Sequence, residues 1–352
     1  MQQLTFKNIF AASAMALSLC SSVQAQKNLL ALSKQDHVLV VMDAKTFQVK
    51  AKIPVGNDPH EVIASSDGTT AYVSITYHGT TPHEIDVIDL VHLKRLPDID
   101  ITPLRNPHGL DFANGKLFFS AEGSRAVGSY DPATKKVDWC MGTGEDRTHM
   151  VYATADAKRI YTTNVNAGTV SILQDTMVQP NMGPPPSANQ NKPPGNPPPF
   201  QPKPQKVWLN AVVPVARGAE GFDVSPDGKE LWTAASDDGT VFIIDVYAKK
   251  VTAQADVKTL GANRLKFTPD GKLVLVSSLR TGDLYIIDAA THALVKQMNI
   301  GKGCAGILVA PDSKKALIAS TADNFIAIVD LETFAVLNKI SLGEPDGLAW
   351  GK

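Results

Sequence analysis

The sequence has little cysteine and almost no net charge, and both deficits narrow the classes of protein to which it can belong. Three of the 352 residues are cysteines, and the formal net charge is −1 at pH 7. A chain so nearly neutral has no general attraction for the phosphate backbone of nucleic acids or for anionic lipid. We therefore expect neither a nucleic-acid partner nor insertion into a membrane.

Several catalytic and cofactor motifs are also absent. The sequence contains no Gly-x-Ser-x-Gly elbow, no phosphate-binding loop, no His-Glu-x-x-His pair and no Cys-x-x-Cys-His haem site. Its Asp-Gly turns lack the alternating acidic ligands of a calcium loop. Beyond the N-terminus, no segment repeats its apolar residues with a helical period, which argues against a helical fold.

The sequence does contain a repeated motif, in which an apolar run ends in an acidic residue and a turn follows. Its copies end at Asp43, Asp89, Asp131, Asp175, Asp245, Asp288 and Asp330, and the copy at Asp175 is degraded. The steps between them are 46, 42, about 44, about 70, 43 and 42 residues. A period near 42 with several short β-rich runs per unit is typical of propeller blades. We interpret Asp89, Asp245, Asp288 and Asp330 as turn formers that bind backbone amides just downstream.

A second repeated feature is an Asp-Gly pair between two apolar runs. It occurs at Asp67-Gly68, Asp227-Gly228 and Asp270-Gly271. Both residue types tolerate the positive φ angles of a tight turn, so each pair predicts a β-hairpin. Each unit then supplies four antiparallel strands, and the sequence predicts an all-β, seven-bladed β-propeller.

The two ends of the chain predict how the ring closes. Residues 29–32, 38–42 and 49–53 form three strands of the first blade, and residues 347–350 form a lone strand at the C-terminus. We expect this C-terminal strand to complete the N-terminal blade and to pair with the strand containing residues 38–42. Such closure leaves no open sheet edge.

Residues 1–25 are predicted to be a secretory signal peptide rather than part of the fold. Lys7 gives a basic start, an apolar run follows, and Val23-Gln24-Ala25 offers a cleavage site. Lipid attachment at Cys20 is disfavoured because Leu19 is larger than that processing prefers. We expect a periplasmic monomer with a single domain over residues 26–352.

The remaining cysteines, Cys140 and Cys304, fall on opposite parts of the predicted ring. Export to an oxidising compartment favours disulfides, but a bridge needs two close Cα atoms. We therefore predict no disulfide.

Residues 180–204 form a proline-rich insertion in the fourth blade. They contain 11 of the 23 prolines, a composition that cannot build a core and favours extended, solvated chain. The segment is interpreted as a disordered surface loop or, alternatively, as a docking site for an aromatic-lined groove of a partner.

A polar residue opens the innermost strand in six of the seven predicted blades. Around the ring these positions are His60, His108, His149, Glu220, Asn263, Ala305 and Asp346. Innermost strands line the central channel of a propeller, so the side chains should converge at one mouth. Further charged residues lie close to these positions in the sequence or are expected to reach the same mouth: Glu61, Glu122, Arg147 and Arg264.

Three interpretations of this mouth remain open. His60, His108 and His149 could bind a divalent metal such as zinc or copper. The same groups could bind an anionic or hydroxylated small molecule, with Arg147 and Arg264 as forked donors. The third interpretation is a structural polar lining without a ligand.

The repeats resemble the YVTN-type repeats of the YncE-like proteins. The resemblance rests on Ala71-Tyr72-Val73-Ser74 with Ile88-Asp89-Leu90 and on later copies up to residue 331. It covers residues 27–352 except the insertion, and it implies an exported propeller with any site at the channel mouth. Related propellers include nonenzymatic binding proteins, lactonases, a lyase, and domains of periplasmic redox enzymes that hold copper or a modified haem.

The leading expectation for function is a periplasmic binding or interaction propeller without a reaction of its own. Its partner would be a small molecule or ion, or another periplasmic protein. The alternative is an enzyme at the same mouth, acting as a metal-assisted hydrolase, lactonase or lyase. One histidine or Glu220 would then be the general base, and Arg147 or Arg264 would stabilise negative charge. A third expectation is an accessory protein of a periplasmic metal or redox system.

Overall fold

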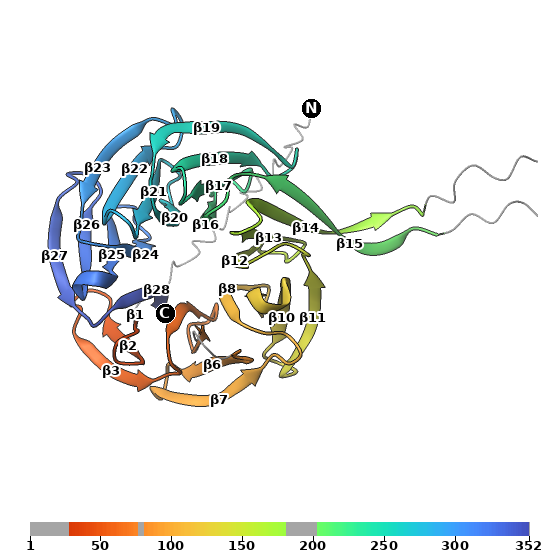
Figure 1. The fold of residues 1–352 in the computed structure, drawn as a ribbon. Coiled ribbons are helices and arrows are strands. Elements are labelled where there is room, and N and C mark those ends of the chain that lie inside the picture. Colours follow the sequence, from red (N-terminus) through yellow and green to blue (C-terminus); the bar gives the residue numbers. More distant parts are fainter. Residues whose placement is uncertain (1–27, 77–80, 181–202, 352) are drawn as a thin grey trace, which may run out of the picture.

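A ring of seven four-stranded antiparallel sheets surrounds a central axis (Figure 1). The computed structural model describes residues 28–76, 81–180 and 203–351. The predicted seven-bladed propeller is therefore confirmed. The predicted signal peptide and most of the proline-rich insertion lie outside the described residues.

Each blade has an innermost strand near the axis and a second strand beside it. The innermost strands, blade by blade, are β28 (Pro345–Gly351), β4 (Pro59–Ala64), β8 (Pro107–Ala113), β12 (Thr148–Ala153), β16 (Ala219–Val224), β20 (Ala262–Phe267) and β24 (Cys304–Val309). The second strands are β1 (Asn28–Ser33), β5 (Thr70–Ile75), β9 (Lys116–Ala121), β13 (Arg159–Asn164), β17 (Glu230–Ala235), β21 (Leu273–Ser278) and β25 (Lys315–Ser320).

The third and fourth strands complete each blade toward the rim. The third strands are β2 (Val38–Asp43), β6 (Glu84–Asp89), β10 (Ala126–Asp131), β14 (Thr169–Val178), β18 (Thr240–Asp245), β22 (Asp283–Asp288) and β26 (Phe325–Asp330). The outer strands are β3 (Val49–Pro54), β7 (Lys94–Asp100), β11 (Lys136–Gly142), β15 (Gln205–Pro214), β19 (Lys250–Lys258), β23 (Leu294–Asn299) and β27 (Val336–Ser341). Two short 3-10 turns follow second strands, η1 (Glu122–Ser124) and η2 (Thr321–Asp323).

The ring closes through the N-terminal blade, as predicted, but the partner predicted for the C-terminal strand was wrong. Strand β28 pairs with β1, through Leu29 opposite Trp350, and not with the strand containing residues 38–42. The reason is the order of strands within a blade. The N-terminal segment lacks the innermost strand, so the returning chain must lie inside β1, which is the second strand.

The hydrophobic core is divided among the seven interfaces between neighbouring blades. Between the first two blades, for example, Leu30 and Val41 pack with Val73 and Ile88, and all four are buried. Comparable clusters fill the other six interfaces. Second and third strands are therefore covered on both faces, which explains their continuous apolar runs in the sequence.

The repeated acids form turns, as predicted. The Oδ1 atom of Asp89 accepts hydrogen bonds from the backbone amides of Val91 and His92, both at 2.9 Å. Asp245, Asp288 and Asp330 repeat this pattern. The Asp-Gly pairs lie in the hairpins between innermost and second strands, where Gly68, Gly228 and Gly271 have positive φ.

The fourth blade departs from the repeat. Gln174 occupies the position of a turn acid, since it pairs with Arg159 as Asp89 pairs with Thr70. The chain does not turn there but continues to Val178, which pairs with Gln205 on the returning strand. The resulting hairpin projects from the ring (Figure 1), and the proline-rich insertion begins and ends at its tip.

The two described cysteines are both unpaired, in agreement with the predicted lack of a disulfide. Cys140 is exposed on an outer strand, whereas Cys304 is buried at the start of β24. Among the residues that the structure describes, no helix has the length and apolar character needed to span a membrane.

Candidate functional site

In most blades, the residue before the innermost strand has a left-handed backbone conformation. The second residue of the strand then lies near the axis. Asp58, Asn106, Arg147 and Glu344 have positive φ angles, between 42° and 57°. In the fifth and sixth blades glycines take the same role. A sharp bend at this point lets the strand start almost at the axis.

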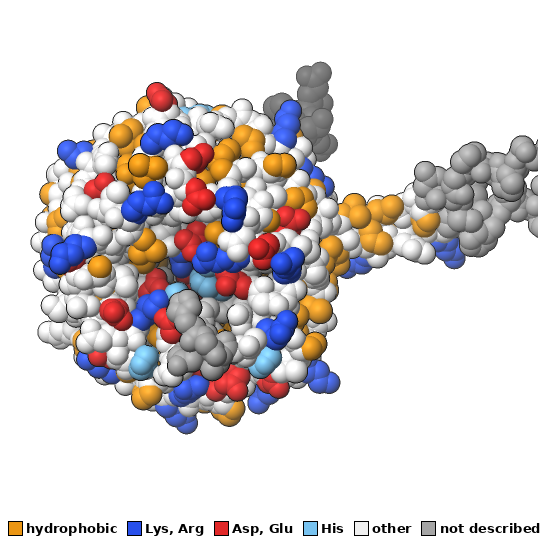
Figure 2. Space-filling model, in the orientation of Figure 1, with side chains coloured by type: hydrophobic (Ala, Val, Ile, Leu, Met, Phe, Trp, Pro, Cys, Tyr) orange, Lys and Arg blue, Asp and Glu red, His pale blue; other side chains and the backbone are white. Residues whose placement is uncertain are grey.

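The predicted mouth residues do converge at one end of the channel. Figure 2 shows histidine, acidic and basic side chains gathered at the centre of the ring on the face seen in Figure 1. The imidazole centroids of His60 and His108 are 5.2 Å apart, and those of His108 and His149 are 3.8 Å apart. Glu220 and Asp346 contact the outer two of these three imidazoles. Aligning the seven sequence repeats was therefore sufficient to predict that these side chains converge.

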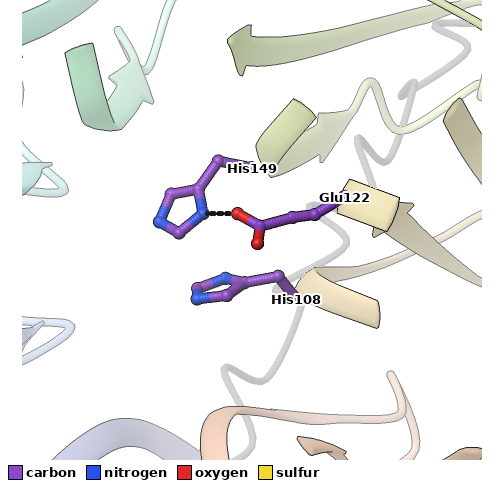
Figure 3. Close-up of side chains that lie close together, drawn as sticks. All are labelled: His108, Glu122 and His149. Atoms are coloured by element: carbon purple, nitrogen blue, oxygen red, sulfur yellow. Dashed lines mark hydrogen bonds and ion pairs between the residues drawn. The ribbon is translucent and has the colours of Figure 1, made fainter. Parts of the chain in front are cut away.

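Among the described residues, two imidazoles and one carboxylate form a group that could hold a metal ion. The ligand atoms of His108, Glu122 and His149 all lie within 4.8 Å of one another. Figure 3 shows the ring of His149 bonded through Nδ1 to Glu122, with the ring of His108 beneath them. Glu122 comes from η1, the turn after the second strand of the third blade.

His108 is held as a neutral imidazole. Its side chain is 5% exposed, and its Nδ1 atom has no hydrogen-bond partner among the described residues. Burial lowers its pKa well below the usual value, and the positive charges of His149 and His60 add to this effect. A buried polar nitrogen without a partner is costly, which makes it a candidate ligand atom.

His149 lies between two carboxylates. Its Nδ1 atom bonds Glu122, and its Nε2 atom is 3.1 Å from Oε1 of Glu220, at an angle outside that of a hydrogen bond. Burial opposes protonation of His149, but the two carboxylates outweigh it and raise the pKa. Burial likewise opposes ionisation of Glu122 and Glu220, yet the charge of His149 and of nearby arginines lowers both pKa values.

His60 belongs to a separate group on the other side of His108. Its Nδ1 atom is 3.2 Å from Asp346, and its Nε2 atom is 3.3 Å from Asp58 and 3.0 Å from Nζ of Lys34. Burial lowers the pKa of His60, but the two carboxylates prevail and raise it to about 9. His60 is therefore a charged partner of acids, not an open ligand.

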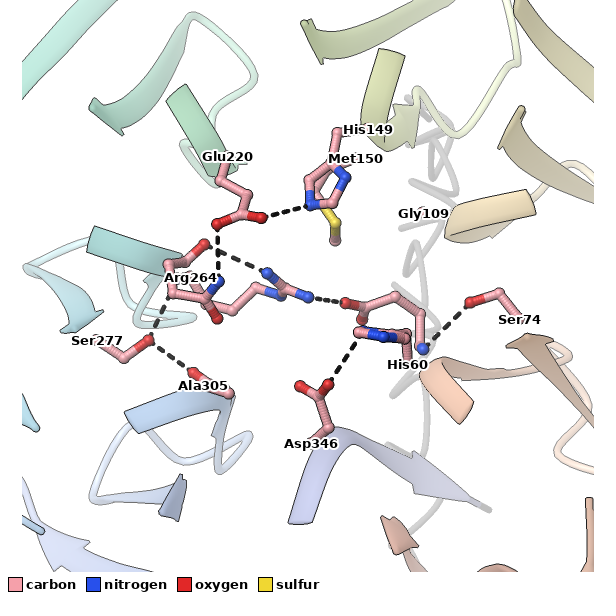
Figure 4. A network of polar contacts seen from close by, with 12 residues as sticks. His60, Ser74, Gly109, His149, Met150, Glu220, Arg264, Ser277, Ala305 and Asp346 are labelled. Atoms are coloured by element: carbon pink, nitrogen blue, oxygen red, sulfur yellow. Dashed lines mark hydrogen bonds and ion pairs between the residues drawn. The ribbon is translucent and has the colours of Figure 1, made fainter. Parts of the chain in front are cut away.

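Arg264 and Glu61 cross the channel just below the histidines. They occupy the third position of strands in the sixth and second blades, far apart in the ring, and the guanidinium bonds the carboxylate directly. Figure 4 shows the side chain of Arg264 extending from β20 toward the group around His60. The two side chains are 8% and 15% exposed. Burial opposes the charge of Arg264, but Glu61 and other acids raise its pKa.

Glycine at the same third position brings the strands close enough for this bridge. A Cβ atom on Gly109 would lie 2.6 Å from the carbonyl oxygen of His149, and one on Gly347 would lie 2.5 Å from that of His60. Neighbouring innermost strands therefore touch backbone to backbone at this level. The channel is narrow here, and one ion pair can span it.

Arg147 and Asn263 complete the rim beside Glu220. The Nη2 atom of Arg147 is 3.0 Å from Glu220, and its Nε atom is 3.4 Å from Glu122. With 40% of its side chain exposed, Arg147 faces the solvent at the mouth. Asn263 donates to the other oxygen of Glu220 at 2.8 Å.

The structure changes the composition of the predicted site in two respects. Glu122, and not His60, completes the close group with His108 and His149. Lys34 and Asp58 were missed, although both contact His60. A signal for Asp58 exists in the sequence, because Asp58-Pro59-His60 repeats as Asn106-Pro107-His108. Lys34 carries no such signal, since it lies in a hairpin remote from the repeat position.

Comparisons with known proteins identify the fold alone. No protein-family model matches the sequence, and no curated protein matches it. A functionally unknown protein from Desulfotomaculum acetoxidans has a TM-score of 0.70 at 12% identity, over 92% of this chain and 99% of that one. A protein named as a candidate 6-phosphogluconolactonase from Bacteroides fragilis has a TM-score of 0.69 at 16% identity, over 94% and 99%. The dihydro-heme d1 dehydrogenase NirN, in complex with DHE, has a TM-score of 0.60 at 13% identity, over 92% and 75%.

Proposed function

We propose that this chain is an exported, YVTN-repeat, YncE-like propeller that binds a divalent transition-metal ion at the histidine mouth. The observation that carries the proposal is the group of His108, Glu122 and His149, with ligand atoms within 4.8 Å of one another. Two imidazoles and a carboxylate are a donor set that suits zinc and related ions. Export rests on the N-terminal sequence, and family membership rests on the repeats.

The state of His108 supports a metal ligand more than a structural lining, whereas His149, whose pKa is raised by two carboxylates, would release a proton when it binds an ion. His108 is neutral and its Nδ1 atom is buried without a partner. A structural lining would be expected to satisfy that nitrogen. Glu122 and His149 already contact each other, so an ion between them would replace their mutual hydrogen bond.

The geometry needs only a small adjustment. Ligand atoms around one zinc ion lie roughly 3–4 Å apart, because zinc–nitrogen bonds are about 2.0–2.1 Å long. On binding, the widest separation in the group, at most 4.8 Å, would shorten, and the contact between Glu122 and His149 would widen to admit the ion. Glu220 and Arg147 would then be outer partners, and Glu220 would keep the ring of His149 oriented.

A reaction at this mouth is the second candidate, and Arg147 is the observation that favours it. Its guanidinium is half exposed beside Glu122 and Glu220, where it could stabilise an oxyanion on a bound lactone or ester. The named activity of one structural neighbour, a candidate 6-phosphogluconolactonase, belongs to the same reaction class. An accessory role in a periplasmic metal system would use the same three ligands without a reaction.

Zinc and copper titrations of the purified, metal-stripped protein test the proposal. We expect one bound ion per chain, lost in His108→Ala and kept in the control His92→Ala, because His92 is exposed and bonded to Asp89 far from the channel. Titration calorimetry and elemental analysis both measure the stoichiometry. Equal binding by the two variants, or no binding by the wild type, would contradict the proposal. Hydrolysis of a panel of lactones by the zinc-loaded protein then separates binding from catalysis.

A further inference from the structure

The channel contains a second compartment, on the far side of the bridge between Arg264 and Glu61. A cavity of about 470 Å³ begins at these two residues and extends to Ser65 and Pro269, next to the Asp-Gly turns. None of the three mouth histidines lines it. Its volume falls within the roughly 300–1,000 Å³ typical of small-molecule sites. The metal site and this cavity therefore open on opposite faces of the ring.

The walls of the cavity are divided into a polar half and an apolar half. The fifth residues of four consecutive innermost strands supply the polar half: Asp111, Tyr152, Asp223 and Lys266. The remaining three blades supply apolar side chains: Ile63, Leu308, Leu348 and Trp350. All eight side chains are half-buried, as expected of residues that face an enclosed space.

The polar half offers both donors and acceptors, and one of its two carboxylates is paired with its ammonium group. Asp223 lies 3.6 Å from the ammonium group of Lys266 and accepts a 2.9 Å bond from the backbone amide of Phe267. Asp111 accepts from the amides of Phe112 and Ala153, at 2.8 and 2.7 Å. Burial raises the pKa of Asp111 to about 6, so this carboxyl group keeps a proton in mildly acidic solution.

The apolar half presents a fixed aromatic surface. The indole nitrogen of Trp350 donates to the carbonyl oxygen of Val309 at 2.9 Å, which anchors the ring at the cavity wall. Leu308 and Leu348 lie beside it in the same cluster of side chains. A ligand here meets a flat apolar surface on one side and mixed hydrogen-bonding groups on the other.

We propose that this cavity binds a neutral, polyhydroxylated ring of sugar size. A hydroxyl group donates and accepts at once, so it can use the carboxylates of Asp111 and Asp223 together with the donors of Lys266 and Tyr152. The apolar face of a pyranose ring fits a wall built from Trp350 and leucines. An anion would meet the carboxylates of Asp111 and Asp223, and a cation would compete with Lys266 for Asp223.

Calorimetric titrations with D-glucose, D-galactose and maltose test the proposal, with choline and gluconate as charged comparison ligands. We expect saturable binding of at least one neutral sugar, and affinity reduced about tenfold or more in Asp223→Asn and Trp350→Phe. Leu308→Trp should abolish binding by filling the cavity. His108→Ala should leave binding unchanged, which separates this site from the proposed metal site.

Asp86→Asn is the matched control for Asp223→Asn. Asp86 also bonds a backbone amide, that of Gly56 at 2.7 Å, and a basic side chain, Arg95 at 2.8 Å, but it does not line the cavity. We expect a comparable loss of stability in both variants and a loss of binding in Asp223→Asn alone. The proposal is overturned by preferential binding of choline or gluconate, by equal sugar affinity in the two variants, or by no saturable sugar binding up to about 50 mM.

Discussion

The two ends of the central channel are built from the same seven strands but have different chemistry. At one end, three imidazoles lie among carboxylates and arginines, and charge is concentrated around His149. At the other end, Asp223 and Lys266 share one wall with Tyr152, and apolar side chains form the opposite wall. The bridge between Arg264 and Glu61 separates the two ends. One repeated strand can therefore carry two unrelated sites, because its second and fifth residues face different compartments.

Breaking the bridge should have the largest effect on stability. Arg264→Met leaves the carboxylate of Glu61 buried without its partner, and we expect the free energy of unfolding to fall by about 3–5 kcal/mol. The double variant Arg264→Met, Glu61→Met should recover most of this loss, because no unpaired charge remains. Urea unfolding of the three proteins measures both effects. A single variant as stable as the wild type would show that the bridge does not hold the channel together.

Substituting single side chains should show which residues at the histidine end bind the metal ion. Glu122→Gln is expected to weaken zinc binding about 100-fold, or about 2.7 kcal/mol, because it removes a charged ligand. His60→Gln should change affinity less than about fivefold, since His60 is a charged partner of Asp346 and Asp58. Calorimetry on the two variants measures the difference. Loss of binding in His60→Gln with retention in Glu122→Gln would restore the three-histidine site.

The opposite end should be recognisable by its pH dependence. The pKa of Asp111 is raised by burial to about 6, above its usual value of 3.8. The folded protein therefore keeps this proton after the unfolded chain has lost it, and Asp111 lowers the free energy of unfolding as pH rises from about 4 to 6. Relative to the wild type, Asp111→Asn should become more stable over that interval by an amount on the order of 2 kcal/mol. Denaturation at several pH values measures this, and a constant difference between the proteins would contradict the account.

Removing the insertion should have the smallest effect on stability and should leave both ends of the channel unchanged. Val178 and Gln205 are paired at the tip of the projecting hairpin, so a short turn can replace residues 181–202 without strain. We expect the melting temperature to change by less than about 5 °C, which corresponds to about 1–2 kcal/mol for a chain of this length. Zinc binding should be unchanged. A larger decrease would mean that the segment packs against the ring.

The sequence predicted the histidine end better than the opposite end, for a physical reason. Histidine is uncommon at the start of a core strand, so three copies at the same position of the repeat stand out in the sequence. Asp111 and Asp223, in contrast, alternate with apolar residues as in any half-exposed strand. Glu122 was expected near the mouth, but its contact with His149 depends on the path of η1, which the repeat does not determine. The partner of the C-terminal strand was mispredicted because the N-terminal blade lacks its innermost strand, so its first strand in the chain is the second in the sheet.

Anomalous diffraction from zinc-soaked crystals, recorded at the zinc absorption edge, tests the central claim most directly. We expect one strong peak at the mouth, bounded by His108, Glu122 and His149, and no peak in the cavity beyond the bridge between Arg264 and Glu61. A peak centred on His60, Asp58 and Asp346, or the absence of any peak in the channel, would contradict it.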